Sequence, residues 1–323
     1  MNSSHDRAHA WTGVGYVLLA ATFFSVNGVV SKLVMAAGLS SLRLVEVRCL
    51  GAALLFAAMA AWRRPASLRI GARELGFVAV YGVVGLALVQ WLYLFALGRM
   101  PVSISLLIEF TSPLLIALWV RYVRKEAVHR RIWLALALVL GGLALVAQIW
   151  AGLTLDTLGV LASSLAAVSL AAYYLLGERG LAGRDAWSLA AWSFAAAAAF
   201  WAVLQPWWSY PFDQLAVPVG LRGDGAGPLV PTWVLVLWVV VLGTLAPFSL
   251  VLAALGRIGA TRVGLVGTSE PPLAGVIAWL AIGETLAPVQ VAGAVVVLAG
   301  IVLAESARQS PGPPAVAGDG VVV

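Results

Sequence analysis

Uncharged runs of about twenty residues recur along the sequence, and they restrict its fold more than any other feature. Seven of these runs are Ala10–Ser31, Leu75–Gly98, Ile132–Leu155, Thr157–Gly177, Ala186–Phe212, Ala226–Gly256 and Thr285–Ala304. An α-helix needs roughly 20 apolar residues to cross the hydrocarbon core of a membrane. The chain is 62% hydrophobic and only 11% charged, whereas a soluble domain has about 25% charged residues. This composition excludes a water-soluble globular protein and a disordered chain.

Three further runs reach the length of a membrane span only when charged residues are allowed inside them. They are Leu42–Trp62, Met100–Val120 and Val263–Gly283. With these runs included, the sequence predicts ten transmembrane helices and an all-α polytopic membrane protein. An ionisable side chain inside a span is costly, and by default it indicates a functional site. The three runs therefore contain the residues of greatest interest.

Basic residues lie mainly on one side of the predicted membrane. With the N-terminus inside, the inner segments contain fifteen Lys and Arg residues, whereas the outer loops contain only Arg43, Arg99 and Arg222. Because basic loops stay in the cytoplasm, we predict a multi-pass protein of the cell membrane with both termini cytoplasmic. The net charge of +6 is thereby explained by topology and does not indicate a nucleic acid partner.

The second half of the chain repeats the first half without a gap. The sequence Ala-Leu-Gly-Arg that begins at Ala96 recurs at Ala254, 158 positions later. Further pairs at the same offset are Pro113 with Pro271, Glu126 with Glu284, and Gly142 with Gly300. Each half has five predicted helices, an odd number, so the second copy enters the membrane from the opposite side. Inverted repeats are typical of secondary transporters, with the binding site near the midplane between the halves.

A single integral membrane domain is expected over residues 1–323. Within it we predict a short cytoplasmic N-terminus (1–10), a first repeat (11–150), a second repeat (157–304) and a disordered cytoplasmic tail (305–323) rich in Pro and Gly. The pair Gly141-Gly142 and the heptad from Gly293 to Gly300 place small residues on two helices. Such residues allow close helix contact, either within one chain or in a homodimer.

A recognisable pattern surrounds the repeated prolines and the first two helices. Its parts are Pro113 followed by Lys125-Glu126, Glu270-Pro271 followed by Gly283-Glu284, and Asn27, Lys32 and Arg48. This pattern resembles the drug/metabolite transporter superfamily, specifically its ten-helix EamA-type members, over residues 11–304. The resemblance implies export or exchange of small polar metabolites, amino acids or drugs through a central cavity. The chain departs from the pattern where Ser112-Pro113 replaces the Glu-Pro of the second half, with the acid earlier at Glu109.

Glu109 lies near the middle of its predicted helix, as the tenth residue of the run that begins at Met100. At about 1.5 Å per residue, this is roughly 15 Å into the hydrocarbon. Ser105, Glu109 and Ser112 follow at helical spacing and would form one polar stripe. The acid is therefore either a proton-carrying or cation-binding group, or a neutral carboxyl group hydrogen-bonded within the bundle.

Prolines interrupt several predicted helices. The predicted helix breaks are Pro113, Pro247, Pro271 and Pro272. A proline has no N–H, so the backbone carbonyl one turn earlier loses its helical hydrogen-bond donor. Inside a membrane, such a free carbonyl is tolerated only where other protein groups or a water-filled cavity provide a donor. Glu270 precedes two of these prolines. The two copies are thus predicted to bring a broken helix and an acid to comparable depth, and the alternative is a kink without a ligand role.

Arg48 has two interpretations, because only fourteen uncharged residues separate it from Arg63. The side chain either faces the interior, as an anion contact or a partner of Glu109 or Glu270, or snorkels to the surface. The resemblance favours the interior. The full set of candidate binding residues is Asn27, Arg48, Gln90, Trp91, Glu109, Ser112, Tyr173 and Glu270. The amides and aromatics among them could equally serve helix packing.

The sequence contains no signature of catalysis or ATP hydrolysis. There is no Walker A motif, and the single Cys and three His residues predict neither a metal site nor a cofactor. We therefore predict a secondary active or facilitative transporter, and not an enzyme. It would export a small metabolite, amino acid or drug across the bilayer by alternating access, and protons are a candidate coupling ion. The alternative is an intramembrane enzyme acting on a lipid-like substrate, although no His lies in any predicted span.

The inverted topology predicts opposite accessibility for two equivalent loops. In a variant with Cys49 replaced by Ala, a single cysteine would be placed at Ala127 or at Ala287. In intact cells, a membrane-impermeant maleimide should label the cysteine at 287 and should reach the cysteine at 127 only after lysis. Labelling of both positions from the same side would rule out the inverted arrangement.

Overall fold

The chain folds into a helical bundle with one short hairpin. The computed structural model describes residues 3–100, 102–150, 156–221, 228–282 and 287–306. Within these ranges the only strands are β1 (Pro218–Gly220) and β2 (Leu229–Pro231), which pair antiparallel. The tail predicted at 305–323 lies outside the described residues, apart from its first two positions, which end a helix. The predicted N-terminal segment is helical from Ser3 onward.

The first half of the chain contains five crossings. Its elements are α1 (Ser3–Ala36), α2 (Ser41–Arg63), the 3₁₀ turn η1 (Pro65–Leu68), α3 (Ala72–Val80), the π-helical η2 (Tyr81–Leu88), α4 (Val89–Leu97), α5 (Val102–Glu109), α6 (Ser112–Tyr122) and α7 (Arg130–Ala147). Together, α3, η2 and α4 form one apolar span, Ala72–Ala96. A second composite span, Ile104–Tyr122, joins α5 and α6 across a break. The predicted stripe of Ser105, Glu109 and Ser112 is therefore not continuous, because the break separates Glu109 from Ser112.

The second half repeats this order. Its elements are α8 (Thr157–Leu181), α9 (Ala186–Leu204), the 3₁₀ turns η3 (Trp207–Ser209) and η4 (Phe212–Ala216), the hairpin, α10 (Thr232–Val240), the π-helical η5 (Val241–Leu245), α11 (Ala246–Gly267), α12 (Glu270–Ile282) and α13 (Pro288–Ser306). The apolar helix Thr232–Gly267 is 36 residues long but bends at Gly259, where φ is 74° and ψ is 166°. Only glycine adopts this conformation readily.

The predicted ten-helix architecture is confirmed. Eight helices in the described part are long and apolar enough to span a membrane, and Pro288–Ala304 is a shorter apolar helix. The bend at Gly259 divides the longest of the eight, so that residues 260–267 continue with α12 as a separate crossing. Counted in this way, the described ranges contain ten crossings.

The two halves match in register as well as in order. In the first half a helix ends at Glu109 and the next begins at Ser112. In the second half, 158 residues further on, one ends at Gly267 and the next begins at Glu270. The π-helical segments η2 and η5 overlap at the same offset. The duplication therefore preserved the departures from regular α-helix as well as the spans.

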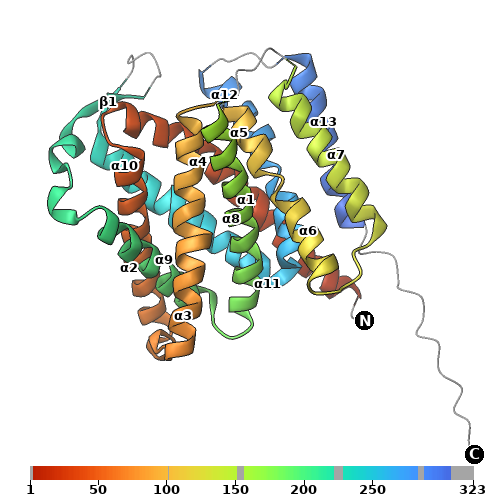
Figure 1. The fold of residues 1–323 in the computed structure, drawn as a ribbon, viewed down its shortest axis with the longest axis horizontal. Helices are drawn as coiled ribbons and strands as arrows, with labels where there is room; N and C mark the ends of the chain where they lie inside the picture. The colour runs from red at the N-terminus through yellow and green to blue at the C-terminus, as the bar shows by residue number, and fades with distance from the viewer. Residues whose placement is uncertain (1–2, 101, 151–155, 222–227, 283–286, 307–323) are drawn as a thin grey trace, which may run out of the picture.

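Packing between the halves is reciprocal. The first helix of each half contacts the third helix of the other, α1 against α11 and α8 against η2 and α4. The second helices, α2 and α9, pack together. The fifth helices, α7 and α13, lie side by side at one edge of the molecule (Figure 1). This exchange of equivalent contacts is what a pseudo-two-fold axis in the membrane plane produces.

Aspartates outside the membrane spans fix the starts of two helices. Asp156 Oδ1 accepts a hydrogen bond from the Gly159 N–H at 2.7 Å, at the start of α8. Asp185 Oδ1 accepts from the Trp187 and Ser188 N–H groups, both at 3.1 Å, at the start of α9. Partial burial alone raises the pKa of Asp185, but its hydrogen bonds with Ser188 and Trp187 bring the pKa below its ordinary value. Such N-caps satisfy backbone donors that the helix leaves free.

Glycines allow α7 and α13 to meet backbone to backbone. A Cβ on Gly142 would lie 2.8 Å from the Gly293 carbonyl oxygen, and a Cβ on Gly293 would lie 2.7 Å from that of Gly142. Gly300 likewise faces Val139 on α7. Small residues at helix contacts are the usual basis of association in lipid, where no hydrophobic force drives helices together. These glycines thus serve contacts within the chain.

The Gly141-Gly142 pair provides a matched test of this packing. We expect Gly142→Ala to destabilise the protein by about 1–3 kcal/mol, because the added methyl group overpacks the contact. At Gly141 an added Cβ would meet no atom within 4 Å, so this position should accept alanine without loss. Thermal unfolding of the purified protein in detergent would measure both. Equal effects of the two substitutions would contradict the observed packing.

Candidate functional site

A cavity of about 110 Å³ lies between the two repeats. Side chains of α1, α2, α4 and α5 line it from the first repeat, and side chains of α8, α11 and α12 from the second. Most of the wall is apolar or aromatic, with a few polar groups that converge on the interior. This composition is typical of a small-molecule site.

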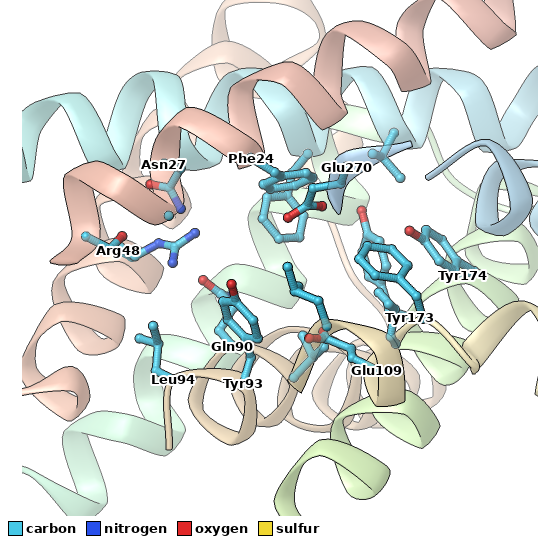
Figure 2. Close-up of a pocket in the computed structure, with 18 residues that line it drawn as sticks. Phe24, Asn27, Arg48, Gln90, Tyr93, Leu94, Glu109, Tyr173, Tyr174 and Glu270 are labelled. Atoms are coloured by element: carbon cyan, nitrogen blue, oxygen red, sulfur yellow. The ribbon is translucent and has the colours of Figure 1, made fainter. Parts of the chain in front are cut away.

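The charged groups of the cavity lie at opposite ends. Figure 2 shows Arg48 and Asn27 on one side and Glu109 and Glu270 on the other, with Tyr93 between them. Among the ion pairs of the described residues, none joins Arg48 to a carboxylate. The cavity is therefore bipolar, with a cationic end and an acidic end.

The two glutamates flank equivalent helix breaks from opposite sides. Glu109 is the last residue of α5, and Glu270 is the first residue of α12. Glu109 is 8% exposed, and in the described part of the chain its carboxyl group has no hydrogen-bond or ion-pair partner. The alternative that Glu109 is a carboxyl group hydrogen-bonded within the bundle therefore finds no partner residue in the described part of the chain. Both acids instead line the same cavity.

Helix α1 supports the break before α12. Ser25 Oγ lies 3.0 Å from the Glu270 carbonyl oxygen and 2.8 Å from the Ala21 carbonyl oxygen. The Thr268 hydroxyl group donates to the Leu265 carbonyl at 2.5 Å. Hydroxyl groups of Ser25 and Thr268 therefore contact backbone carbonyls on both sides of the break.

Arg48 is held in the cavity wall by η5 of the other repeat. Its Nε donates to Thr244 Oγ1 at 3.0 Å, and its Nη2 donates to the Gly243 carbonyl oxygen at 3.2 Å. The residue is 5% exposed, so the guanidinium group does not reach the surface and the snorkelling alternative does not apply. Both of these partners are neutral.

Three acceptors near this end lack donors. Asn27 Oδ1, Ser31 Oγ and Gln90 Oε1 are buried and have no hydrogen-bond partner among the described residues. The Gln90 amide is oriented by its Nε2, which donates to the Leu86 carbonyl at 2.7 Å. All three side chains line the cavity. Buried acceptors without donors are unfavourable, and a bound polar solute is one means of satisfying them.

Aromatic rings close the acidic end. Tyr173 stacks on Tyr81 with ring centroids 5.8 Å apart, and contacts Tyr174 and Phe248 at 5.2 and 5.5 Å. Phe248 also meets Phe24 edge to face at 5.4 Å. The sequence analysis did not single out Phe24, Tyr174 or Phe248. Aromatic residues are common in this chain, so composition and spacing gave no signal that these three face the cavity.

The structure brings six of the eight candidate binding residues together. Those that line the cavity are Asn27, Arg48, Gln90, Glu109, Tyr173 and Glu270. Trp91 instead packs against Trp201 and Phe95, at 6.1 and 5.6 Å between ring centroids. Ser112 is fully buried outside the cavity wall.

The four predicted helix breaks fall into two kinds. Pro113, Pro271 and Pro272 occupy the first turns of α6 and α12, directly after interruptions of the helix. No interruption occurs at Pro247, which lies at the junction of η5 and α11. The helix continues there because the preceding residues adopt π-helical hydrogen bonding.

Separate polar networks join helix ends on the two sides of the bundle. On one side, Arg43 pairs with Glu46 at 2.7 Å and donates to Ser209 Oγ at 2.7 Å. On the other side, Glu178 accepts from Arg124 at 2.8 Å and from the Ala260 N–H at 3.1 Å. The second network links the segment after α6 and helix α8 to the bend at Gly259. No group of three or more His, Cys, Asp or Glu side chains suited to a metal occurs in the described residues.

Comparison with known proteins yields a family and a fold. The EamA-like transporter family matches the chain twice, over residues 11–148 and 157–305. The threonine/homoserine exporter RhtA of Escherichia coli K12 is 28% identical over 298 residues, covering 90% of each chain. The protein of the same name from Salmonella typhimurium LT2 is 28% identical over 299 residues, again with 90% of each chain covered. A solved crystal structure aligns with a TM-score of 0.70 and 18% identity over 94% of this chain and 98% of that chain, a likeness of fold alone.

Proposed function

Since the chain belongs to the EamA-like transporter family, we propose that it exports a small amino acid or a closely related zwitterion across the cell membrane. The observation that carries this proposal is the bipolar cavity. Arg48 has no acidic partner among the described residues, and it lies in the same cavity as two carboxylates that also lack partners. Unpaired charges inside a membrane protein are costly unless a ligand or water compensates them.

A zwitterion complements both ends of this cavity. Its carboxylate suits the guanidinium group of Arg48, because the planar fork of guanidinium donors matches the two oxygens of a carboxylate. Its ammonium group suits the acidic end, at Glu270 and Glu109. The threonine/homoserine exporters, to which this chain is similar over 90% of its length, are named for substrates of this class. Gln90 and Asn27 offer acceptors for a side-chain hydroxyl group.

The size of the cavity favours a small metabolite over a drug. Its volume is about 110 Å³, whereas sites for drug-sized ligands occupy about 300–1,000 Å³. We therefore place drugs outside the proposed substrate range.

Alternating access is the proposed mechanism. The reciprocal packing of the repeats supports two related arrangements in which one half rocks against the other around a midplane site. The networks around Arg43 and Glu178 lie on opposite sides of the bundle and would act as the two gates. In the proposed orientation both termini are cytoplasmic, which places the Glu178 network inside. A homodimer is not part of the proposal, because the glycines that suggested one are used within the chain.

Proton coupling is the proposed energy source, with facilitated diffusion as the competing mechanism. Glu109 and Glu270 share one cavity, and one proton exchanged for one substrate ammonium group would keep the net charge of the acidic end balanced. An intramembrane enzyme has no specific observation in its favour.

The proposed function is tested with purified protein in proteoliposomes. Vesicles loaded with radiolabelled L-threonine or L-homoserine should lose the label faster than protein-free vesicles, and the released solute should be chemically unchanged. A modified product would indicate the enzyme alternative. Absence of protein-dependent release for both amino acids, from vesicles that contain folded protein, would contradict the proposal.

The acidic end makes a separate prediction. Glu270→Gln should weaken the apparent affinity for L-threonine about ten- to hundredfold, because a charge-assisted contact is worth about 1.5–3 kcal/mol. It should also flatten the dependence of efflux on an imposed pH gradient. Glu126→Gln is the matched control, since Glu126 is exposed after α6 and should behave as the unsubstituted protein. Wild-type affinity and pH dependence in both Glu270→Gln and Glu109→Gln would remove the acids from the mechanism.

A further inference from the structure

Arg48 and Pro247 belong to different repeats but act on the same backbone carbonyl, that of Gly243. In an α-helix, the N–H of residue 247 would donate to the carbonyl oxygen of residue 243. Proline has no N–H, so this donor is missing. The Arg48 Nη2 group donates to the Gly243 carbonyl at 3.2 Å in its place. A side chain of α2 thus provides the hydrogen bond that the proline removes from the helix α10–η5–α11.

A second bond extends this link into the π-helical segment. Arg48 Nε donates to Thr244 Oγ1 at 3.0 Å, and the Thr244 hydroxyl group donates to the Val239 carbonyl at 2.8 Å. Asn27 closes the other side of Gly243, where its Oδ1 occupies the space that a side chain at 243 would need. Single turns of π-helix inside α-helices are frequent at functional sites. Here the π-helical turn is attached to the cationic group of the cavity.

The guanidinium group of Arg48 therefore binds the helix α10–η5–α11 and also faces the cavity. Both of its hydrogen-bonded partners are neutral, and the side chain lines the cavity. A carboxylate carries a negative charge and can accept two parallel hydrogen bonds from a guanidinium group, whereas the Gly243 carbonyl is neutral and accepts one from Arg48. A carboxylate that enters the cavity thus competes with the Gly243 carbonyl for the guanidinium group.

We propose that Arg48 couples binding of the substrate carboxylate to a rearrangement of the π-helical segment Val241–Leu245. This inference rests on the proposed function and adds to it the element that moves. When the substrate carboxylate binds the guanidinium group, the Gly243 carbonyl loses its only side-chain donor within the described residues. Pro247 has no N–H with which to replace that donor. The segment then changes its hydrogen bonding, and α10 and α11 move relative to α1 and α2. A ligand shifts a conformational equilibrium only through such a difference in contacts between the two states.

Pro247→Ala tests the coupling directly, because alanine restores an N–H at position 247. The helix would no longer depend on Arg48, and Arg48 would remain free for the substrate. Binding of L-threonine to the purified variant should be as tight as in the unsubstituted protein or tighter. The maximal rate of L-threonine efflux from proteoliposomes should fall by about fivefold or more, the lower end of typical coupling effects. A purely structural role for Pro247 would not separate rate from affinity in this way.

Pro288→Ala is the matched control. Pro288 begins α13, where a proline removes no interior hydrogen bond, so this variant should retain both binding and efflux. Thr244→Val is the second test variant, since valine has nearly the shape of threonine but offers Arg48 no acceptor. It should show the same separation, with binding retained and efflux reduced.

The outcomes distinguish this inference from the proposed function. Normal efflux in both Pro247→Ala and Thr244→Val, or a parallel loss of binding and efflux in folded protein, would overturn the coupling while leaving amino acid export intact. Failure of the unsubstituted protein to bind or release L-threonine and L-homoserine would overturn the proposed function itself.

Discussion

In the hydrocarbon of a membrane, every backbone N–H and C=O must find its partner inside the protein, and this requirement governs the architecture of the chain. Most crossings meet it with unbroken helices. The exceptions lie around the cavity, at the break between Glu109 and Ser112, the break between Gly267 and Glu270, and the π-helical segments η2 and η5. At these places side chains add hydrogen bonds to backbone carbonyls. Ser25 contacts the Glu270 carbonyl, and Arg48 contacts the Gly243 carbonyl.

The two halves share their helical framework through duplication, and they differ in the charged residues that they contribute to the cavity. The equivalent breaks and the reciprocal helix contacts show that the two halves remain copies of one five-helix unit. Their charged residues are not copies. Glu270 aligns with Ser112, and Glu109 aligns with Gly267, so each half places its acid on a different side of the break. Both acids nevertheless line one end of the cavity, and Arg48 lies at the other end.

Much of this arrangement could be predicted from the sequence, because membrane solvation imposes simple rules. Uncharged runs predicted the spans, and an odd number of spans in each repeat predicted the inversion. Glu109, Glu270 and Arg48 stood out because ionisable residues inside a span are rare. Trp91 was selected as an aromatic residue and Ser112 by its helical spacing from Glu109, and both lie outside the cavity wall. Side-chain direction around a helix depends on which neighbour covers each face, and single residues do not carry that information.

The largest difference between expectation and structure concerns Pro247. The sequence suggested a helix break, because a proline removes a backbone donor in any context. The structure instead keeps the helix continuous, with π-helical bonding before the proline and an arginine from the other repeat at the freed carbonyl. The partner lies almost 200 residues away in the chain, so local sequence could not have identified it.

The sequence by itself determined that the chain crosses the membrane ten times in two opposed copies and that a few charged residues lie within the apolar layer. These properties follow from the cost of exposing charge and free backbone groups to lipid, which acts on each segment separately. Only the tertiary structure decided that Arg48 faces a cavity opposite two glutamates, and that aromatic rings of α1, α8 and α11 enclose it. Those relations arise when helices distant in sequence pack together, because each side chain then acquires the neighbours that determine its burial, its hydrogen bonds and its charge balance.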